Sequence, residues 1–162
     1  MNLRPLEQRD APLMLEWMHD PDVVGHLSTN FAEKTLADCQ RFIDWASTTR
    51  EDLHLAIADE ENTYMGTVSL KHICGGTAEF AITVRACAMG KGYSRFGMDA
   101  ILRKGISELG LSAIYWCVSR HNARAVRFYD KNGYVRTQDV PTPIRDAYTP
   151  EQNADFIWYV YQ

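Results

Sequence analysis

The chain has 162 residues, of which 46% are hydrophobic and 23% are charged, a composition typical of a globular protein. This length suits one compact unit, so we expect residues 1–162 to form a single domain with one buried core. The formal net charge is −4 and no run of Lys or Arg stands out. These features argue against nucleic acid or an anionic membrane as a partner.

The chain begins MNLRPLEQRDAPL, without a basic segment followed by an apolar run, and it contains no stretch of 18 apolar residues. We therefore expect a cytoplasmic protein that does not enter a membrane. The five histidines show no HxxxH spacing and the cysteines form no CxxC pair, which argues against a metal site and a disulfide framework. The cysteines are Cys39, Cys74, Cys87 and Cys117.

Two helices are predicted before the main run of strands. Asp10 can cap a helix that extends to Met18, and Thr35 can start another that extends to Ala46. Short alternating or continuously apolar segments predict strands. These segments are 53–58, 67–73, 78–84, 114–119 and 156–161.

Glycines mark the connections between several of these elements. Gly75 and Gly76 predict a tight turn that joins two antiparallel strands. The spacing of apolar residues then changes from that of a strand to that of a helix. It predicts an amphipathic helix over 92–109, with one face formed by Met98, Ile101, Leu102, Gly105 and Leu109. A further helix over 122–132 ends at Gly133, which suits a left-handed C-terminal cap. The order of elements predicts a mixed sheet with helices packed on its faces.

The segment Met89-Gly90-Lys91-Gly92-Tyr93-Ser94 lies between a predicted strand and the start of a predicted helix. Unpaired N–H groups converge at such a terminus, and glycines let an anion approach the backbone closely. We therefore expect this loop to bind a pyrophosphate, and the alternative is an ordinary glycine-rich helix start. The spacing fits neither GxGxxG, because Arg95 stands where the third glycine is needed, nor the P-loop, because Met98 stands where lysine is needed.

This loop resembles the coenzyme A pyrophosphate loop of the GNAT superfamily, Q/R-x-x-G-x-G/A, with Met89 and Ser94 departing from the usual residues. The segment from Asn122 to Tyr134 resembles the other hallmark of that superfamily, N-x-x-A-x-x-x-Y-x-x-x-G-F/Y, at every specified position. Together the resemblance spans about residues 64 to 135. It implies an α/β (α+β) fold with a mixed, mostly antiparallel sheet of about six to seven strands and about four helices.

The resemblance also implies transfer of an acetyl group from acetyl-CoA to a primary amine, without a metal. It places Tyr129 beside the coenzyme sulfur as the general acid, since a phenol stays protonated at neutral pH. The alternative for Tyr129 is a core aromatic with a polar tip. Some members carry a glutamate where this chain has Glu79, and there it acts as the general base. Other members use a different strand, where this chain has Cys117. The alternative for Glu79 is that its side chain faces the solvent. The alternative for Cys117 is that it is a small residue of the core.

The residues expected to contact the coenzyme come from three segments. Asn122 also suits the N-cap of its helix, and Arg124 and Arg127 are candidates for a coenzyme phosphate. The expected coenzyme set is Ile82, Thr83, Val84, Met89, Gly90, Lys91, Gly92, Tyr93, Ser94, Asn122, Arg124 and Arg127.

The sequence does not identify the amine acceptor. The resemblance places its pocket near the first two helices and the last strands, which carry Trp17, Trp45, Trp158, Tyr159 and Tyr161. A protein N-terminus, a polyamine, an amino sugar or an aminoglycoside is compatible with such a pocket. The alternative function is a catalytically silent acyl-CoA-binding or sensing domain. Both a monomer and a homodimer are compatible with the sequence.

Overall fold

A computed structural model describes residues 1–27 and 29–162. Its seven-stranded sheet has the order β1-β2-β3-β4-β5-β7-β6, and β4 with β5 is the parallel pair among antiparallel neighbours. The strands are β1 Asn2–Pro5, β2 Leu53–Ala58, β3 Tyr64–Cys74, β4 Thr77–Val84, β5 Ala113–Ser119, β6 Val135–Thr137 and β7 Phe156–Tyr161. This confirms the predicted mixed, mostly antiparallel sheet.

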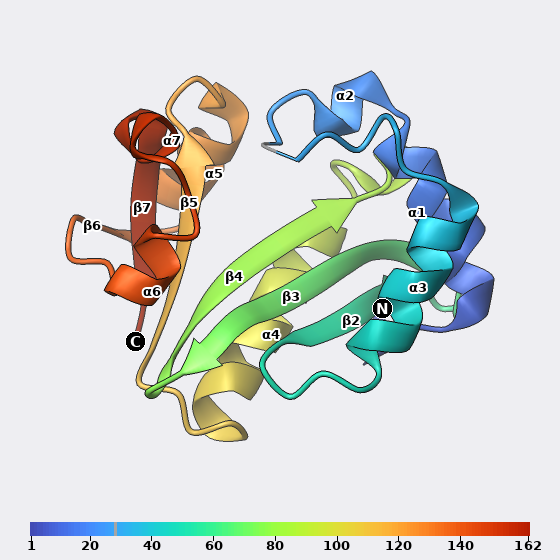
Figure 1. Ribbon diagram of the computed structural model, residues 1–162, viewed down its shortest axis with the longest axis horizontal. Helices are drawn as coiled ribbons and strands as arrows, with labels where there is room; N and C mark the ends of the chain where they lie inside the picture. The colour runs from blue at the N-terminus through green and yellow to red at the C-terminus, as the bar shows by residue number, and fades with distance from the viewer. Residues whose placement is uncertain (28) are drawn as a thin grey trace.

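Helices of the described residues lie on both faces of the sheet (Figure 1). They are α1 Ala11–Met18, α2 Pro21–Val24, α3 Leu36–Ala46, α4 Tyr93–Ser107, α5 Ala123–Lys131, α6 Thr142–Arg145 and α7 Pro150–Asp155. Four of them, α1, α3, α4 and α5, have eight or more residues and correspond to the four helices expected from the sequence.

The main core lies between the sheet and α4. Two glycines of α4 allow this close packing, because a Cβ atom at Gly97 would lie 2.4 Å from Ile57 and one at Gly105 would lie 2.7 Å from Ile114. The expected apolar face of this helix is therefore confirmed through Gly105. Leu109 does not follow the prediction, since the helix ends at Ser107 and Leu109 is exposed.

The opposite face of the sheet is covered by two separate groups of helices. Helices α1 and α3 pack over β2 and β3, and Trp17 of this cluster donates a hydrogen bond to the Tyr64 hydroxyl. Ile144 of α6 packs with Trp158 of β7 and with Cys117 of β5. The β4 strand runs between these two groups (Figure 1).

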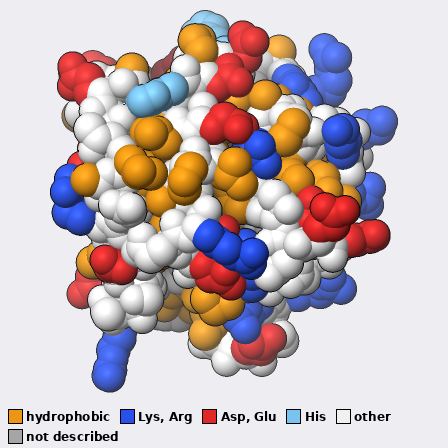
Figure 2. All heavy atoms as spheres, turned by 90° about the vertical axis from the view of Figure 1, so that its right-hand side faces the viewer, with side chains coloured by type: hydrophobic (Ala, Val, Ile, Leu, Met, Phe, Trp, Pro, Cys, Tyr) orange, Lys and Arg blue, Asp and Glu red, His pale blue; other side chains and the backbone are white. Residues whose placement is uncertain are grey.

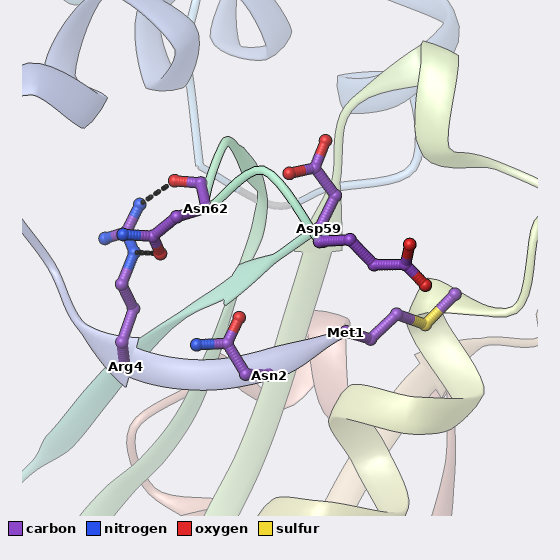
Figure 3. A pocket seen from close by; sticks show the side chains of 6 residues that line it. Met1, Asn2, Arg4, Asp59 and Asn62 are labelled. Carbon is purple, nitrogen blue, oxygen red and sulfur yellow. Dashed lines mark hydrogen bonds between the residues drawn. The ribbon is translucent and has the colours of Figure 1, made fainter.

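Capping explains where the helices begin, with one departure from the prediction. Thr35 caps α3, as the sequence predicts, and it forms a reciprocal capping box with Asp38. Asp10 occupies the N-cap position of α1, but its carboxylate binds the buried guanidinium of Arg4 at 2.7 and 2.8 Å. Figure 3 shows Arg4 at a hollow beside β1, where it also donates to Asn62. Asp10 is therefore a partner in a buried ion pair.

Acidic, basic and hydrophobic side chains are interspersed on the face of the molecule shown in Figure 2. That face carries no extended patch of one charge sign. Within residues 1–27 and 29–162, no helix combines the length and the apolar character that crossing a membrane requires.

Candidate active site

The central feature of the site is a separation between β4 and β5. The two strands pair in parallel only from Thr77 opposite Ala113 to Glu79 opposite Tyr115. Beyond this point β4 continues to Val84 paired with β3, and β5 continues to Ser119 paired with β7. Their facing edges diverge (Figure 1). The predicted coenzyme segment of Ile82, Thr83 and Val84 therefore lies on a strand edge whose backbone groups can pair with an extended ligand.

The predicted pyrophosphate loop lies directly after β4. Gly90 and Gly92 adopt left-handed backbone conformations, with φ of 74° and 88°. A Cβ atom at Gly90 would meet nothing within 4 Å, and α4 begins at Tyr93. The loop thus leads into the N-terminus of a 15-residue helix, whose dipole and first N–H groups attract an anion. Lys91 is exposed on the same loop, and Met89, Tyr93 and Ser94 are half-buried.

A basic groove continues from this loop. It has a volume of about 640 Å³ and is lined by Arg95, Arg124, Arg127, Phe128, Lys131 and Asn132. Arg124 joins the groove to the loop, because its Nη1 lies 3.9 Å from the Met89 sulfur. The structure thus brings the two predicted arginines beside the loop. Four cations next to a helix N-terminus fit a ligand with several phosphate groups, as coenzyme A has.

Tyr129 lies on α5 and faces β5. Its ring contacts those of Trp116 and Tyr159 at centroid distances of 5.5 and 5.0 Å. Burial raises the pKa of the Tyr129 phenol above its usual value, and Cys117 and the neighbouring tyrosines add to this shift. The phenol therefore stays protonated at neutral pH and can donate its proton. Asn122, seven residues earlier, caps α5 by accepting a hydrogen bond from the N–H of Ala125 at 3.2 Å.

Glu79 lies on the face of β4 opposite to the one that carries Phe80, as the alternation of side chains along a strand requires. The alternative of a solvent-facing glutamate is wrong, since only 2% of the residue is exposed. The Tyr148 hydroxyl donates a hydrogen bond to Glu79 Oε1. Oε2 has no hydrogen-bond partner among the described residues, although Lys71 Nζ lies 3.7 Å away and His72 Nε2 lies 3.5 Å away.

Cys117 lies near both predicted catalytic side chains, since the charge of Glu79 affects the pKa of Cys117 and Cys117 affects the pKa of Tyr129. Burial raises the pKa of the Cys117 thiol to about 12, and the charge of Glu79 contributes to this shift. A thiol with this pKa stays protonated and is a weak nucleophile and a weak base at neutral pH. The carboxylate of Glu79 is consequently the better proton acceptor of the two.

Sequence reasoning missed Tyr148, which lies 69 residues from its partner Glu79. Burial is the main cause that raises the pKa of the Tyr148 phenol, followed by Cys117 and Glu79. Tyr148 therefore acts as a hydrogen-bond donor to the carboxylate. It belongs to the segment between α6 and α7, which has no recognisable motif, so no pattern in the sequence pointed to it.

The aromatic residues expected near the acceptor pocket differ in their surroundings. Trp17 and Tyr159 are buried core residues, and the Tyr159 hydroxyl donates to Asp130. Trp158 packs in the cluster beside Cys117, whereas Trp45 is 46% exposed on α3. Among the described residues, no group of three or more His, Cys, Asp or Glu side chains is arranged to hold a metal ion.

Comparison with known proteins agrees with this arrangement. The family model described as acetyltransferase (GNAT) domain matches residues 1–135, so the chain belongs to the GNAT acetyltransferases. It is an acetyl-CoA-dependent N-acetyltransferase, and acetyl-CoA is its cosubstrate. A search of curated proteins finds no match.

Solved structures share the fold over nearly the whole chain. Spermidine N-acetyltransferase from Vibrio cholerae in complex with CoA and spermine aligns with a TM-score of 0.81 and 19% identity, covering 99% of this chain and 94% of that one. A dodecameric structure of spermidine N-acetyltransferase from the same organism, in an intermediate state, has a TM-score of 0.74 and 21% identity. That alignment covers 99% of this chain and 92% of the other.

Proposed function

We propose that this enzyme acetylates a small cationic primary amine, with Glu79 as the general base and Tyr129 as the general acid. The observation that carries the proposal is the buried Glu79 carboxylate, which has one oxygen held by Tyr148 and the other without a hydrogen-bond partner in the described chain. A buried carboxylate of this kind is a binding partner for an ammonium group and an acceptor for its proton.

Each part of the site has a distinct task in this proposal. When bound, acetyl-CoA supplies the thioester that the amine attacks. Residues 90–94 hold the pyrophosphate, with Met89 as an auxiliary contact, and Arg124 and Arg127 bind a further coenzyme phosphate. The backbone of residues 82–84 orients the pantetheine arm and polarises the thioester carbonyl. Asn122 holds the first turn of α5 and so fixes the position of Tyr129.

The proton transfers follow from the two side chains. An aliphatic ammonium group has a pKa near about 10.4 and must lose a proton before its nitrogen can attack. Glu79 takes that proton. Tyr129 gives its own proton to the departing sulfur and recovers one from the newly acylated nitrogen. The raised pKa of Tyr129 keeps this proton on the phenol until the sulfur needs it.

Among the acceptors that the sequence leaves open, we favour a polyamine. Tyr148, Phe156 and Trp158 form an aromatic cluster beside the carboxylate, and such rings attract cationic groups. The solved structures compared above are spermidine N-acetyltransferases, which agrees with this choice. We further propose that residues 1–162 act as one cytoplasmic domain, as a monomer or a homodimer.

The test is a thiol-release assay with acetyl-CoA and separate acceptors: spermidine, an N-terminal peptide, glucosamine and an aminoglycoside. We expect release with spermidine, and Glu79→Gln should reduce it about 10²-fold or more, as expected for loss of a general base. Release with another acceptor alone would refute the polyamine proposal. Acetyl-CoA binding without release on any amine would favour the silent sensing domain.

A further inference from the structure

Two consecutive residues of β3 approach the same oxygen atom of Glu79. Lys71 Nζ lies 3.7 Å and His72 Nε2 lies 3.5 Å from Oε2. In a regular strand, neighbouring side chains point to opposite faces, so only one of the two could reach this carboxylate. An irregularity of the strand must therefore bring the second one there.

The irregularity is a β-bulge at His72. The Gly75-Gly76 turn pairs Cys74 with Thr77, and an unbroken ladder from this pair would set His72 opposite Glu79. The observed partner of Glu79 is Lys71, because the register shifts by one residue between Lys71 and Cys74. His72 has a φ of 53°, which is uncommon for a residue other than glycine. Bulges often re-aim a side chain in this way.

The loop before β2 holds this strained backbone in place. Asp52 Oδ1 accepts a hydrogen bond from the N–H of His72 at 2.9 Å, and the N–H of Ile73 donates to the Glu51 carbonyl at 2.9 Å. Strained backbone conformations persist where the surrounding structure fixes them, and they are frequent at functional sites.

The bulge connects a buried carboxylate to the surface. The Glu79 side chain is 2% exposed, whereas the His72 side chain is 42% exposed. A base that collects a proton in each turnover must release it before the next one, and Glu79 is itself shielded from water. The His72 imidazole therefore lies close to the carboxylate and is at the same time exposed to solvent.

We propose that His72 carries protons between Glu79 and the solvent, an inference that rests on the proposed role of Glu79 as general base. The acceptor ammonium gives one proton to the Glu79 carboxylate, which becomes a carboxylic acid. Oε2 then passes this proton to the Nε2 lone pair of neutral His72. The imidazolium releases a proton to water or buffer, and both side chains return to their starting states.

The other groups around Glu79 are unsuited to this transfer. Tyr148 and Cys117 keep their protons, since their pKa values are raised. Lys71 carries an ammonium group, which has donors only and no lone pair that could take up the proton. Asp52 binds the backbone of His72. Histidine is the side chain whose ordinary pKa allows both directions of transfer at neutral pH.

The experiment compares His72→Asn with Lys71→Gln. Asparagine tolerates a left-handed backbone, so His72→Asn keeps the bulge and removes the proton carrier. Lys71→Gln removes a positive group from the same carboxylate oxygen without removing the imidazole. Thiol release would be measured with saturating acetyl-CoA and the active amine, in dilute buffer of low proton-carrying capacity and then with added imidazole.

We expect His72→Asn to lower kcat at least about tenfold in dilute buffer. Imidazole should restore most of this rate, with little change in the KM for acetyl-CoA. Lys71→Gln should show no imidazole response. Equal rates for His72→Asn and the wild type in dilute buffer would overturn the proposal, and so would a loss that imidazole does not restore. If Glu79→Gln were as active as the wild type, the role of Glu79 as base would fail instead.

Discussion

Tyr129→Phe separates the chemistry of the site from its stability. The phenol forms no side-chain hydrogen bond with the described residues, and its ring packs against Trp116 and Tyr159. Phenylalanine preserves these ring contacts, so the unfolding free energy should change by less than about 1.5 kcal/mol, the usual limit for a buried substitution that conserves volume. Loss of the general acid should lower kcat about 10²-fold or more, which corresponds to about 2.7 kcal/mol of transition-state stabilisation.

The assay is thiol release at saturating acetyl-CoA and amine, run beside thermal unfolding of both proteins. The KM for acetyl-CoA should change little, because the coenzyme contacts proposed for the loop and the groove are retained. In the wild type, the raised pKa of Tyr129 keeps the phenol protonated above the usual tyrosine range. Tyrosine ionisation should therefore cause no loss of kcat up to about pH 10. A decrease of less than about threefold in Tyr129→Phe would refute its role as the acid.

Three further predictions concern the parts of the fold that support the site. Asp10→Ala should cost about 3–5 kcal/mol in urea unfolding, because the buried Arg4 guanidinium loses its close carboxylate partner and keeps only the exposed carboxylate of Glu7, 4.0 Å away; a cost below about 1 kcal/mol would contradict this. Burial lowers the pKa of His54, so the unfolded state binds a proton more readily and stability should fall as pH drops below about 6.5. Between pH 7.5 and pH 5.5, the unfolding free energy of His54→Gln should therefore decrease less than that of the wild type. Gly66→Ala would place Cβ 2.5 Å from the Thr83 carbonyl oxygen, and this should destabilise the fold by about 1–3 kcal/mol and raise the KM for acetyl-CoA. An unchanged KM would show that the β4 edge had not moved.

Periodic elements were predictable because their pattern repeats over several turns or alternations. The β2 and β7 strands agree with their predicted bounds, and the predicted left-handed cap at Gly133 is present. Shorter elements contain too few residues to show a repeating pattern of apolar and polar side chains. The β1 strand has four residues, one of them a proline, and was not predicted. Thr149 followed by Pro150 and Gln152 was a usable signal for α7, since they form a capping box with proline in the first turn.

The arrangement of the candidate site could be anticipated only where its residues lie in a motif. The glycine loop and Tyr129 follow fixed spacings, and the structure places both beside the separated strands. The contacts of Glu79 could not be derived in the same way. Its hydrogen bond from Tyr148 depends on how α6 and α7 pack, and its approach to His72 depends on a register shift that the Gly75-Gly76 turn does not indicate.

The short parallel ladder between β4 and β5 divides the sheet into two groups of strands that share only three residue pairs. Coenzyme bound along the open edge of β4 would take the place of the missing ladder. Part of its binding free energy would then appear as stability of the fold, in proportion to the logarithm of its concentration above the Kd. Amides of β5, β6 and β7 should consequently exchange with solvent more slowly when acetyl-CoA is present. The enzyme would be at its most compliant between turnovers, when products leave and substrates enter.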